Sequence, residues 1–384
     1  MRRILLISVA LAALAVGALL AWSTVRQDRE FQRLIAAGDA ALLRDDSYGA
    51  IEAFSGALAL RRDSMLAYLK RGDTYRRRGE LNAALRDLRE AASLDPAAPK
   101  AVELLGDVNA AMGRHERAAQ HYRSFIALDD RSPGVLYKLA LSHFRYGEAA
   151  AAIEPLRQAV ALDARVAEAH YLLGLCLRAG GAEDEALEAL LKAVAINGAF
   201  IAAREELADV HSRAGRERDA IEQLEAIAAI EPTRPERLVT VGLAYARWGR
   251  TDAAILALGR AAERHPDHPG VYAALGRVWL DTADLNKDRV ALNKAIEALQ
   301  PQVASGEASS DALMLYGRAM FLAGNTGVAE RVLRQATATP PVDPAALRYL
   351  ADVADRLGHR DEARDARLRY AALVGGDTPG PVVR

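Results

Sequence analysis

The sequence is poor in three kinds of feature, and each scarcity excludes a class of protein. One cysteine in 384 residues excludes an intramolecular disulfide framework. Aromatic residues make up 5% of the chain although 51% is hydrophobic, a composition that suits alanine and leucine packing between helices better than a β-sandwich or barrel. Charge of one sign is not in excess, with 50 basic and 51 acidic residues, so the total charge gives no reason to expect nucleic acid as a partner.

What the chain has instead is a period of thirty-four residues. Each period contains a small residue, glycine or alanine, and a second small residue twelve positions later. A bulky apolar residue follows four positions after the second one, as in Ala84 and Leu88. The spacing of four places these side chains on one face of a helix. The chain is therefore predicted to be an array of small helical units that stack on their neighbours. The first small residue of successive units is Gly38, Gly72, Gly106, Ala140, Gly174, Ala208, Gly242 and Gly276.

This spacing closely resembles the tetratricopeptide repeat, whose signature residues recur with a period of 34. The unit from Met65 to Ala98 departs from the signature at Arg71, where the family usually has leucine. Its other signature positions carry Tyr68, Gly72, Tyr75, Ala84, Leu88, Ala91 and Pro96. The resemblance implies an all-α fold, a right-handed α-solenoid of about ten helix-turn-helix units with a concave inner face.

The resemblance extends over residues 31–376, with one irregular step. Between Gly276 and Gly317 the period stretches to forty-one residues, which places an expanded unit near residues 277–309. Seven extra residues make almost two helical turns, so they can lengthen a helix and keep its buried face in phase. A C-terminal tail is expected over residues 377–384.

The N-terminus carries a long apolar run. Residues 4–22 read ILLISVALAALAVGALLAW, nineteen residues without a charge, preceded by Arg2 and Arg3. Because this run is long enough to cross a bilayer as a helix, we predict a basic segment over residues 1–3, a transmembrane signal anchor over 4–22 and a linker over 23–30. A cleaved signal peptide is the alternative, since Val16-Gly17-Ala18 offers a cleavage site inside the run.

The charges around this run bear on its orientation. Arg2 and Arg3 favour a cytoplasmic N-terminus, whereas Arg26, Arg29 and Arg33 follow the run closely and weaken the asymmetry. We expect a single-pass protein of the inner (cytoplasmic) membrane with a periplasmic solenoid, and the opposite topology stays open.

The residues that could bind a metal ion or take part in catalysis have structural explanations. Asp284, Asn286 and Asp288 begin like a calcium loop, but the sixth and twelfth positions carry Arg289 and Ala295 where such a loop needs glycine and glutamate. Turn and N-cap roles fit these residues better. Cys176 and three histidines that occupy signature positions of the repeat are expected to pack, namely His143, His170 and His211. No catalytic residue, cofactor or metal ligand is predicted.

Function is expected on the concave face. In the resembling family, the first helix of each unit lines this face and contacts a bound protein segment. Arg145 and Arg247 stand out because the position one turn earlier carries Leu141 or Leu243 and offers no acidic partner. Aromatic residues beside arginine are typical of binding hot spots, although Tyr137 and Tyr171 could also simply pack between first helices. The predicted protein-binding residues are Tyr137, Leu141, Phe144, Arg145, Tyr171, Leu175, Arg178, Arg213 and Arg247.

Together these features predict a non-catalytic, membrane-anchored scaffold that binds protein or peptide segments in its groove. By analogy with similar anchored arrays in bacteria, it is expected to support assembly of an envelope complex. A soluble periplasmic factor released by signal cleavage and an accessory subunit of an envelope polysaccharide or glycosylation enzyme are the alternatives. An enzyme within this chain would need a further domain, and no unassigned stretch is long enough for one.

Overall fold

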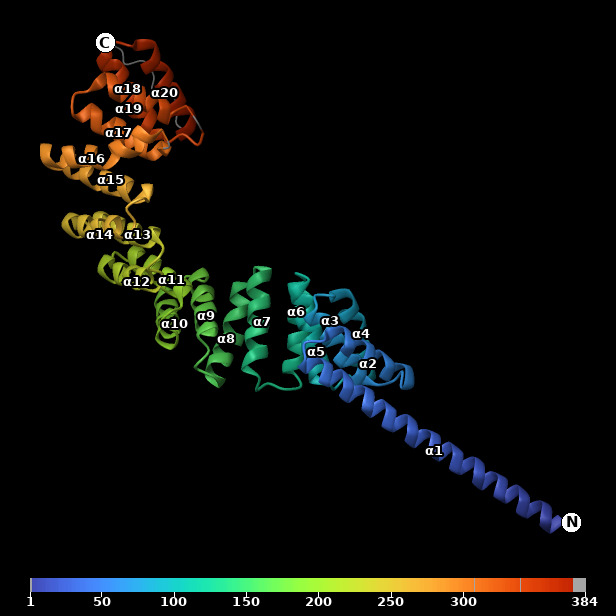
Figure 1. Cartoon of the computed structure of the whole chain (residues 1–384). Coiled ribbons are helices and arrows are strands. Elements are labelled where there is room, and N and C mark those ends of the chain that lie inside the picture. The colour runs from blue at the N-terminus through green and yellow to red at the C-terminus, as the bar shows by residue number, and fades with distance from the viewer. Residues whose placement is uncertain (1, 307, 339, 376–384) are drawn as a thin grey trace. The chain divides into compact units, whose positions relative to one another are not determined.

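The computed structural model describes residues 2–306, 308–338 and 340–375. These described residues form helices and no strand, which confirms the all-α prediction (Figure 1). The chain divides into two compact units, Met1–Gly198 and Ala199–Arg384, and each is treated by itself below.

Each unit contains ten of the described helices. The helices of the first unit are α1 (Arg2–Leu43), α2 (Ser47–Leu60), α3 (Met65–Arg77), α4 (Leu81–Leu94), α5 (Pro99–Ala111), α6 (His115–Ile126), α7 (Pro133–Tyr146), α8 (Ala149–Leu162), α9 (Ala167–Ala179) and α10 (Glu183–Ile196). Those of the second unit are α11 (Ile201–Arg213), α12 (Glu217–Ile230), α13 (Pro235–Arg247), α14 (Thr251–Arg264), α15 (Pro269–Asn286), α16 (Arg289–Ser305), α17 (Ser310–Leu322), α18 (Thr326–Ala336), α19 (Pro344–Leu357) and α20 (Arg360–Val374).

Consecutive helices pack as pairs, α1 with α2 through to α19 with α20, and the second helix of a pair packs on the first helix of the next within each unit. First helices also contact one another, for example α7 with α9 and α13 with α15. This arrangement confirms the helix pairs that the period predicts.

Small residues sit where the two helices of a pair cross. A Cβ atom added to Gly174 would lie 2.7 Å from the Leu190 side chain, and one added to Gly317 would lie 2.6 Å from Leu333. The recurring alanines of the second helices are equally enclosed, since Ala186 is 0% exposed. The glycine or alanine of each repeat therefore makes room for the bulky residue that the sequence pattern places opposite it.

Glycines end many of the first helices. Gly113 and Gly249 have φ angles of 72° and 75°, in the left-handed region that residues other than glycine rarely adopt. They punctuate the repeat between the helices of a pair, as the sequence indicates.

Arg71, the residue of the second helix pair that departs from the repeat signature, forms an ion pair with Asp87. The Arg71 guanidinium donates hydrogen bonds to both carboxylate oxygens of Asp87, at 2.7 and 2.9 Å, and to the Ser55 hydroxyl at 3.0 Å. The hydrogen bond from Arg71 to Asp87 outweighs the opposing effect of burial and raises the pKa of Arg71. A charged side chain thus replaces the usual leucine without leaving a buried charge unpaired.

Both helices of the expanded repeat, α15 and α16, are longer than those of the repeat before it. α15 has 18 residues and α16 has 17, against 13 and 14 for α13 and α14. Ala295 and Leu299 are fully buried, so the packing pattern resumes after the expansion as predicted. Asp288 accepts hydrogen bonds from the backbone N–H groups of Val290 and Ala291 and caps α16, which confirms its N-cap role.

α1 covers several of the segments predicted for the N-terminus. Residues 23–30, expected to be a linker, are helical and belong to α1, because no glycine or proline interrupts the chain there. The same helix continues into Phe31 and Ile35, which are buried in the first pair. Most side chains of residues 4–21 lie outside those that the structure describes, and among the described residues we find no helix long and apolar enough to span a bilayer. The tail predicted over residues 377–384 also lies outside the described residues.

Candidate protein-binding grooves

Among the cavities of the described structure, one in each unit is lined mainly by the first helices of the pairs. In the first unit, a cavity of about 510 Å³ lies over α3, α5 and α7, and we call it the charged groove. It is lined by Asp73, Arg76, Arg77, Lys100, Glu103, Leu104, Asp107, Ala110, Tyr122 and Lys138. In the second unit, a cavity of about 870 Å³ lies over α13, α15 and the start of α17, and we call it the apolar groove.

Ion pairs between neighbouring helices fill the charged groove. Lys138 of α7 lies 2.7 Å from a Glu103 oxygen and 2.9 Å from an Asp107 oxygen of α5. Lys100 also pairs with Glu103 at 2.8 Å, and the Tyr122 hydroxyl donates to Asp107 at 2.8 Å. On α3, Asp73 accepts from Arg76 and Arg77 at 2.7 and 2.8 Å. Every charged side chain that lines this groove is therefore paired within the chain.

These pairs shift proton affinities. Burial disfavours the ionised form of Glu103, but hydrogen bonds from Lys100 and Lys138 outweigh it and lower the pKa of Glu103. Burial likewise opposes the charge on Lys138, and its hydrogen bonds to Glu103 and Asp107 raise the pKa of Lys138. Burial and the charge of Asp107 raise the pKa of Tyr122. These shifts favour the ionised forms of Glu103 and Lys138 and the neutral form of Tyr122.

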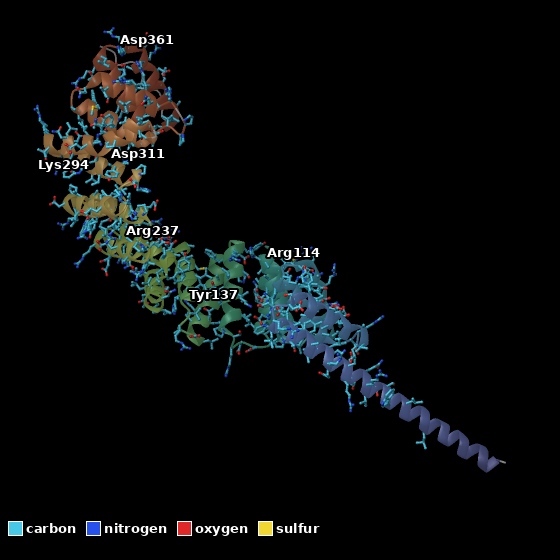
Figure 2. All side chains as sticks on the ribbon, in the orientation of Figure 1. Arg114, Tyr137, Arg237, Lys294, Asp311 and Asp361 are labelled. Carbon is cyan, nitrogen blue, oxygen red and sulfur yellow. The ribbon has the colours of Figure 1, made fainter. Side chains whose placement is uncertain are left out.

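The apolar groove has a different lining. Most of its surface comes from aliphatic and small side chains on α13 and α15, which are Val239, Leu243, Ala246, Ala273, Ala274, Val278 and Leu285. Polar residues form part of the rim, among them Thr240, Arg247, Arg277, Asp281, Thr282 and Asp311. Asp311, labelled in Figure 2, belongs to the first turn of α17 and pairs with Arg277 at 2.6 Å.

The structure divides the predicted protein-binding residues between the two units. Tyr137, Leu141, Phe144 and Arg145 lie on α7, and Tyr171, Leu175 and Arg178 lie on α9, which contacts α7. Arg213 lies on α11 and Arg247 on α13. The first seven residues therefore belong to neighbouring first helices, as the spacing predicts, whereas the last two belong to the other unit.

The predicted residues of α7 are partly buried. Tyr137 (Figure 2), Leu141 and Phe144 pack against the cluster of buried residues that α7 shares with α9, while Arg145 is exposed. Burial raises the pKa of Tyr137, with a contribution from the charge of Glu168. Packing between first helices and exposure to a partner are therefore both features of this patch. Its role in binding stays a prediction.

Of the two arginines of the second unit that the sequence predicts to bind protein, Arg213 and Arg247, only Arg247 lines the apolar groove. Arg213 forms an ion pair with Asp209 at 3.0 Å, one turn earlier on α11. No described residue forms an ion pair or hydrogen bond with Arg247, which is exposed. Leu243 precedes it by one turn and lines the same groove, in agreement with the sequence pattern that singled out Arg247.

Residues predicted to pack are buried. His143, His170 and His211 are 4%, 6% and 7% exposed, respectively. Cys176 is fully buried, and burial raises the pKa of its thiol to about 11, so it is a poor nucleophile.

One cluster went unnoticed in the sequence because its members come from different helices. The ligand atoms of Glu330, His359 and Glu362 lie within 4.8 Å of one another. Arg334 forms ion pairs with Glu330 and Glu362, so an arginine already supplies the positive charge that a cation would bring. This makes the cluster an ion-pair network between α18 and α20.

Comparison with known families identifies the repeats. A tetratricopeptide repeat model matches residues 69–133, 137–200 and 317–378, and over these segments the chain belongs to the tetratricopeptide repeat family. A model of the bacterial transcriptional activator domain matches residues 189–267. No curated protein matches the chain.

Solved structures resemble parts of this chain. The C-terminal part of a tetratricopeptide repeat protein from Cytophaga hutchinsonii is 15% identical, with 63% of this chain and 99% of that chain covered and a TM-score of 0.54. MamA from Desulfovibrio magneticus RS-1 is 24% identical over 44% of this chain and 96% of its own, with a TM-score of 0.43. YrrB, described as a tetratricopeptide repeat protein with an unusual peptide-binding site, is 22% identical over 49% of this chain and 97% of its own, with a TM-score of 0.45.

Proposed function

We propose that this chain is a non-catalytic scaffold that binds segments of other proteins on the concave face of a right-handed α-solenoid. The single observation that carries the proposal is the apolar groove, a cavity of about 870 Å³ over α13 and α15. Its volume falls within the range of ~300 to 1,000 Å³ that is typical of ligand sites. Its aliphatic lining favours a partner that brings apolar side chains out of water.

The patch on α7 and α9 is proposed as a second contact surface. Phe144 and Tyr137 leave part of their rings exposed, and Arg145 next to Phe144 has no ion pair or hydrogen bond with a described residue. Aromatic and arginine side chains contribute strongly to protein interfaces.

Selection of peptides from a random display library on the full chain, held in detergent micelles, tests the scaffold function. We expect enrichment of peptides that bind the wild type and lose affinity in Arg247→Glu, in Arg145→Glu or in Tyr171→Ala. Absence of any enriched peptide, or full binding by all three variants, would refute binding at the apolar groove and at the patch on α7 and α9.

We also propose that residues 4–22 anchor the chain in the inner membrane, with the repeats in the periplasm, where they support assembly of an envelope complex. The helical backbone of α1 supports an anchor, because nineteen residues at ~1.5 Å each reach about 28 Å, close to the ~30 Å of a bilayer core. Since α1 continues unbroken into the buried Phe31, an anchor here is joined to the first helix pair by a helix.

Cell fractionation combined with N-terminal sequencing tests the anchor. An intact N-terminus in the membrane fraction is the expected result. A mature chain that begins after Ala18 would identify the released periplasmic factor in its place.

A further inference from the structure

The expansion of α15 builds part of the apolar groove. α13 ends after 13 residues, whereas α15 runs for 18, and the five additional residues are 282–286. Two of these, Thr282 and Leu285, line the groove. Leu285 is 83% exposed, although it lies beside the aliphatic lining of a cavity. A helix of ordinary length would end before this wall, so the expansion gives this groove a feature that the regular repeat does not supply.

The charges on the groove are unevenly compensated. Arg277 pairs with Asp311 at 2.6 Å, and Asp281 accepts from Arg318 at 2.9 Å. Arg247 has no ion pair or hydrogen bond with any described residue. Arg318 also pairs with Asp284 at 2.7 Å, so this one guanidinium serves two carboxylates. Among the charged residues that line the groove, Arg247 is therefore the one without a partner in the described chain, and its guanidinium favours a carboxylate at that point of the groove.

Two of the hydroxyl groups that line the groove have their protons engaged within the chain. Thr240 and Thr282 each donate to a backbone carbonyl of their own helix at 2.8 Å, so their hydroxyl protons are already engaged. A guanidinium, with its several N–H groups, remains the strongest free donor for a carboxylate.

From these observations we infer that the apolar groove takes a short protein segment that carries aliphatic side chains and a neighbouring carboxylate. An aliphatic side chain packs on Leu285 and Leu243, and a carboxylate accepts hydrogen bonds from Arg247. The aliphatic choice follows from the apolar part of the lining, which is made of small and aliphatic side chains and contains no aromatic ring. The inference rests on the proposed scaffold function and specifies the chemistry of the partner.

Two defined peptides test the inference by fluorescence anisotropy with the full chain in detergent micelles. The first is fluorescein-labelled Ser-Gly-Leu-Asp-Leu-Asp-Leu-Ser-Gly, and the second replaces each aspartate by lysine. We expect saturable binding of the acidic peptide and at least tenfold weaker binding of the lysine peptide. Equal affinities, or no binding of the acidic peptide, would overturn the inference.

Matched variants locate the binding. Arg247→Glu and Leu285→Asp are each expected to weaken the acidic peptide at least tenfold. The controls are Arg250→Glu, three residues further along the chain with its side chain over Trp248, and Val290→Asp, on α16 and 63% exposed. Neither control residue lines the groove. Equal losses in variants and controls would show that the peptide binds elsewhere and overturn the inference.

The outcome separates this inference from the scaffold function. Library peptides that are not acidic, or that still bind Arg247→Glu, would contradict the inference and leave the scaffold function standing. A library that yields no ligand at all would contradict both.

Discussion

The charged groove and the apolar groove are built on the same part of the repeat, yet they present opposite surfaces. Seven charged side chains line the first, and each is paired with another residue of the chain. Aliphatic side chains line most of the second, and Arg247 on its rim has no such partner among the described residues. The positions that fix the helix crossings are alike in the two units, so the difference lies in residues that the repeat leaves free.

The difference matters because the two surfaces respond differently to a partner. A segment that binds the charged groove must replace ion pairs that already satisfy Lys138, Glu103 and Asp107, and the exchange brings little net gain. A segment that binds the apolar groove removes aliphatic surface from water at about 25 cal/mol per Å². The charged groove thus ties helices together, and the apolar groove is the surface that we propose recognises other proteins.

Substitutions at the buried helix crossings, which both units share, are expected to give the largest loss of stability. Ala186→Leu in the first unit and Ala220→Leu in the second insert a bulky side chain at sites that are 0% and 3% exposed. Each should lower the free energy of unfolding by about 1 to 3 kcal/mol, measured by thermal and urea unfolding. Glu188→Leu, at an exposed position of α10, is the control. An equal loss in the control would contradict the register of the repeat.

Removing an ion pair from the charged groove is expected to give the next largest loss of stability. Asp107→Asn removes the charge that pairs with Lys138 and accepts from Tyr122. We expect a loss of about 2 kcal/mol in the free energy of unfolding, since hydrogen bonds to charged groups contribute ~1.5 to 3 kcal/mol. Urea unfolding measures it, and an unchanged midpoint would show that these ion pairs do not hold α5 to α7.

Acid should weaken the charged groove by a smaller amount. The pKa of Glu103 lies below its usual value of 4.5, because hydrogen bonds from Lys100 and Lys138 outweigh burial. The unfolded chain therefore binds this proton at a higher pH than the folded chain, and the stabilisation is complete above about pH 4.5 and lost as the pH falls through the folded pKa. The urea midpoint should decline more steeply below pH 4.5 in the wild type than in Glu103→Gln. Parallel declines would contradict this role for Glu103.

Truncations in the apolar groove should barely change stability. Arg247→Ala and Leu285→Ala alter exposed side chains, so we expect changes within about 0.5 kcal/mol, as for ordinary surface substitutions. Urea unfolding of the two variants beside Asp107→Asn gives the direct contrast. A loss near 2 kcal/mol in either one would show that the apolar groove, too, serves the fold.

The sequence contained enough information for the helix pairs and for the missing acidic partner of Arg247, whose role in binding stays a prediction, and too little for either groove. Glycines and alanines on a fixed step identify buried crossings because the packing there depends on residue size alone. The ion pairs of Lys138 join residues 31 and 35 positions apart, so they belong to neighbouring repeats and have no signal in the spacing within one helix. The expansion near α15 was visible as seven extra residues, but its contribution to the apolar groove depends on which helix takes up those residues.

The linker that was expected over residues 23–30 teaches a related lesson. Charged residues between an apolar run and a repeat suggest a boundary, yet a run without glycine or proline stays helical, and Phe31 packs into the first pair from the same helix. Composition alone does not separate a helical connection from a flexible one.

Hydrogen exchange with and without a library-selected peptide tests the central claim most directly. If the apolar groove recognises protein segments, a saturating peptide will slow amide exchange in α13 and α15, including residues 282–286, and leave α3 and α5 unchanged. Protection confined to α3 and α5, or exchange that is the same with and without the bound peptide throughout α13 and α15, would contradict the account.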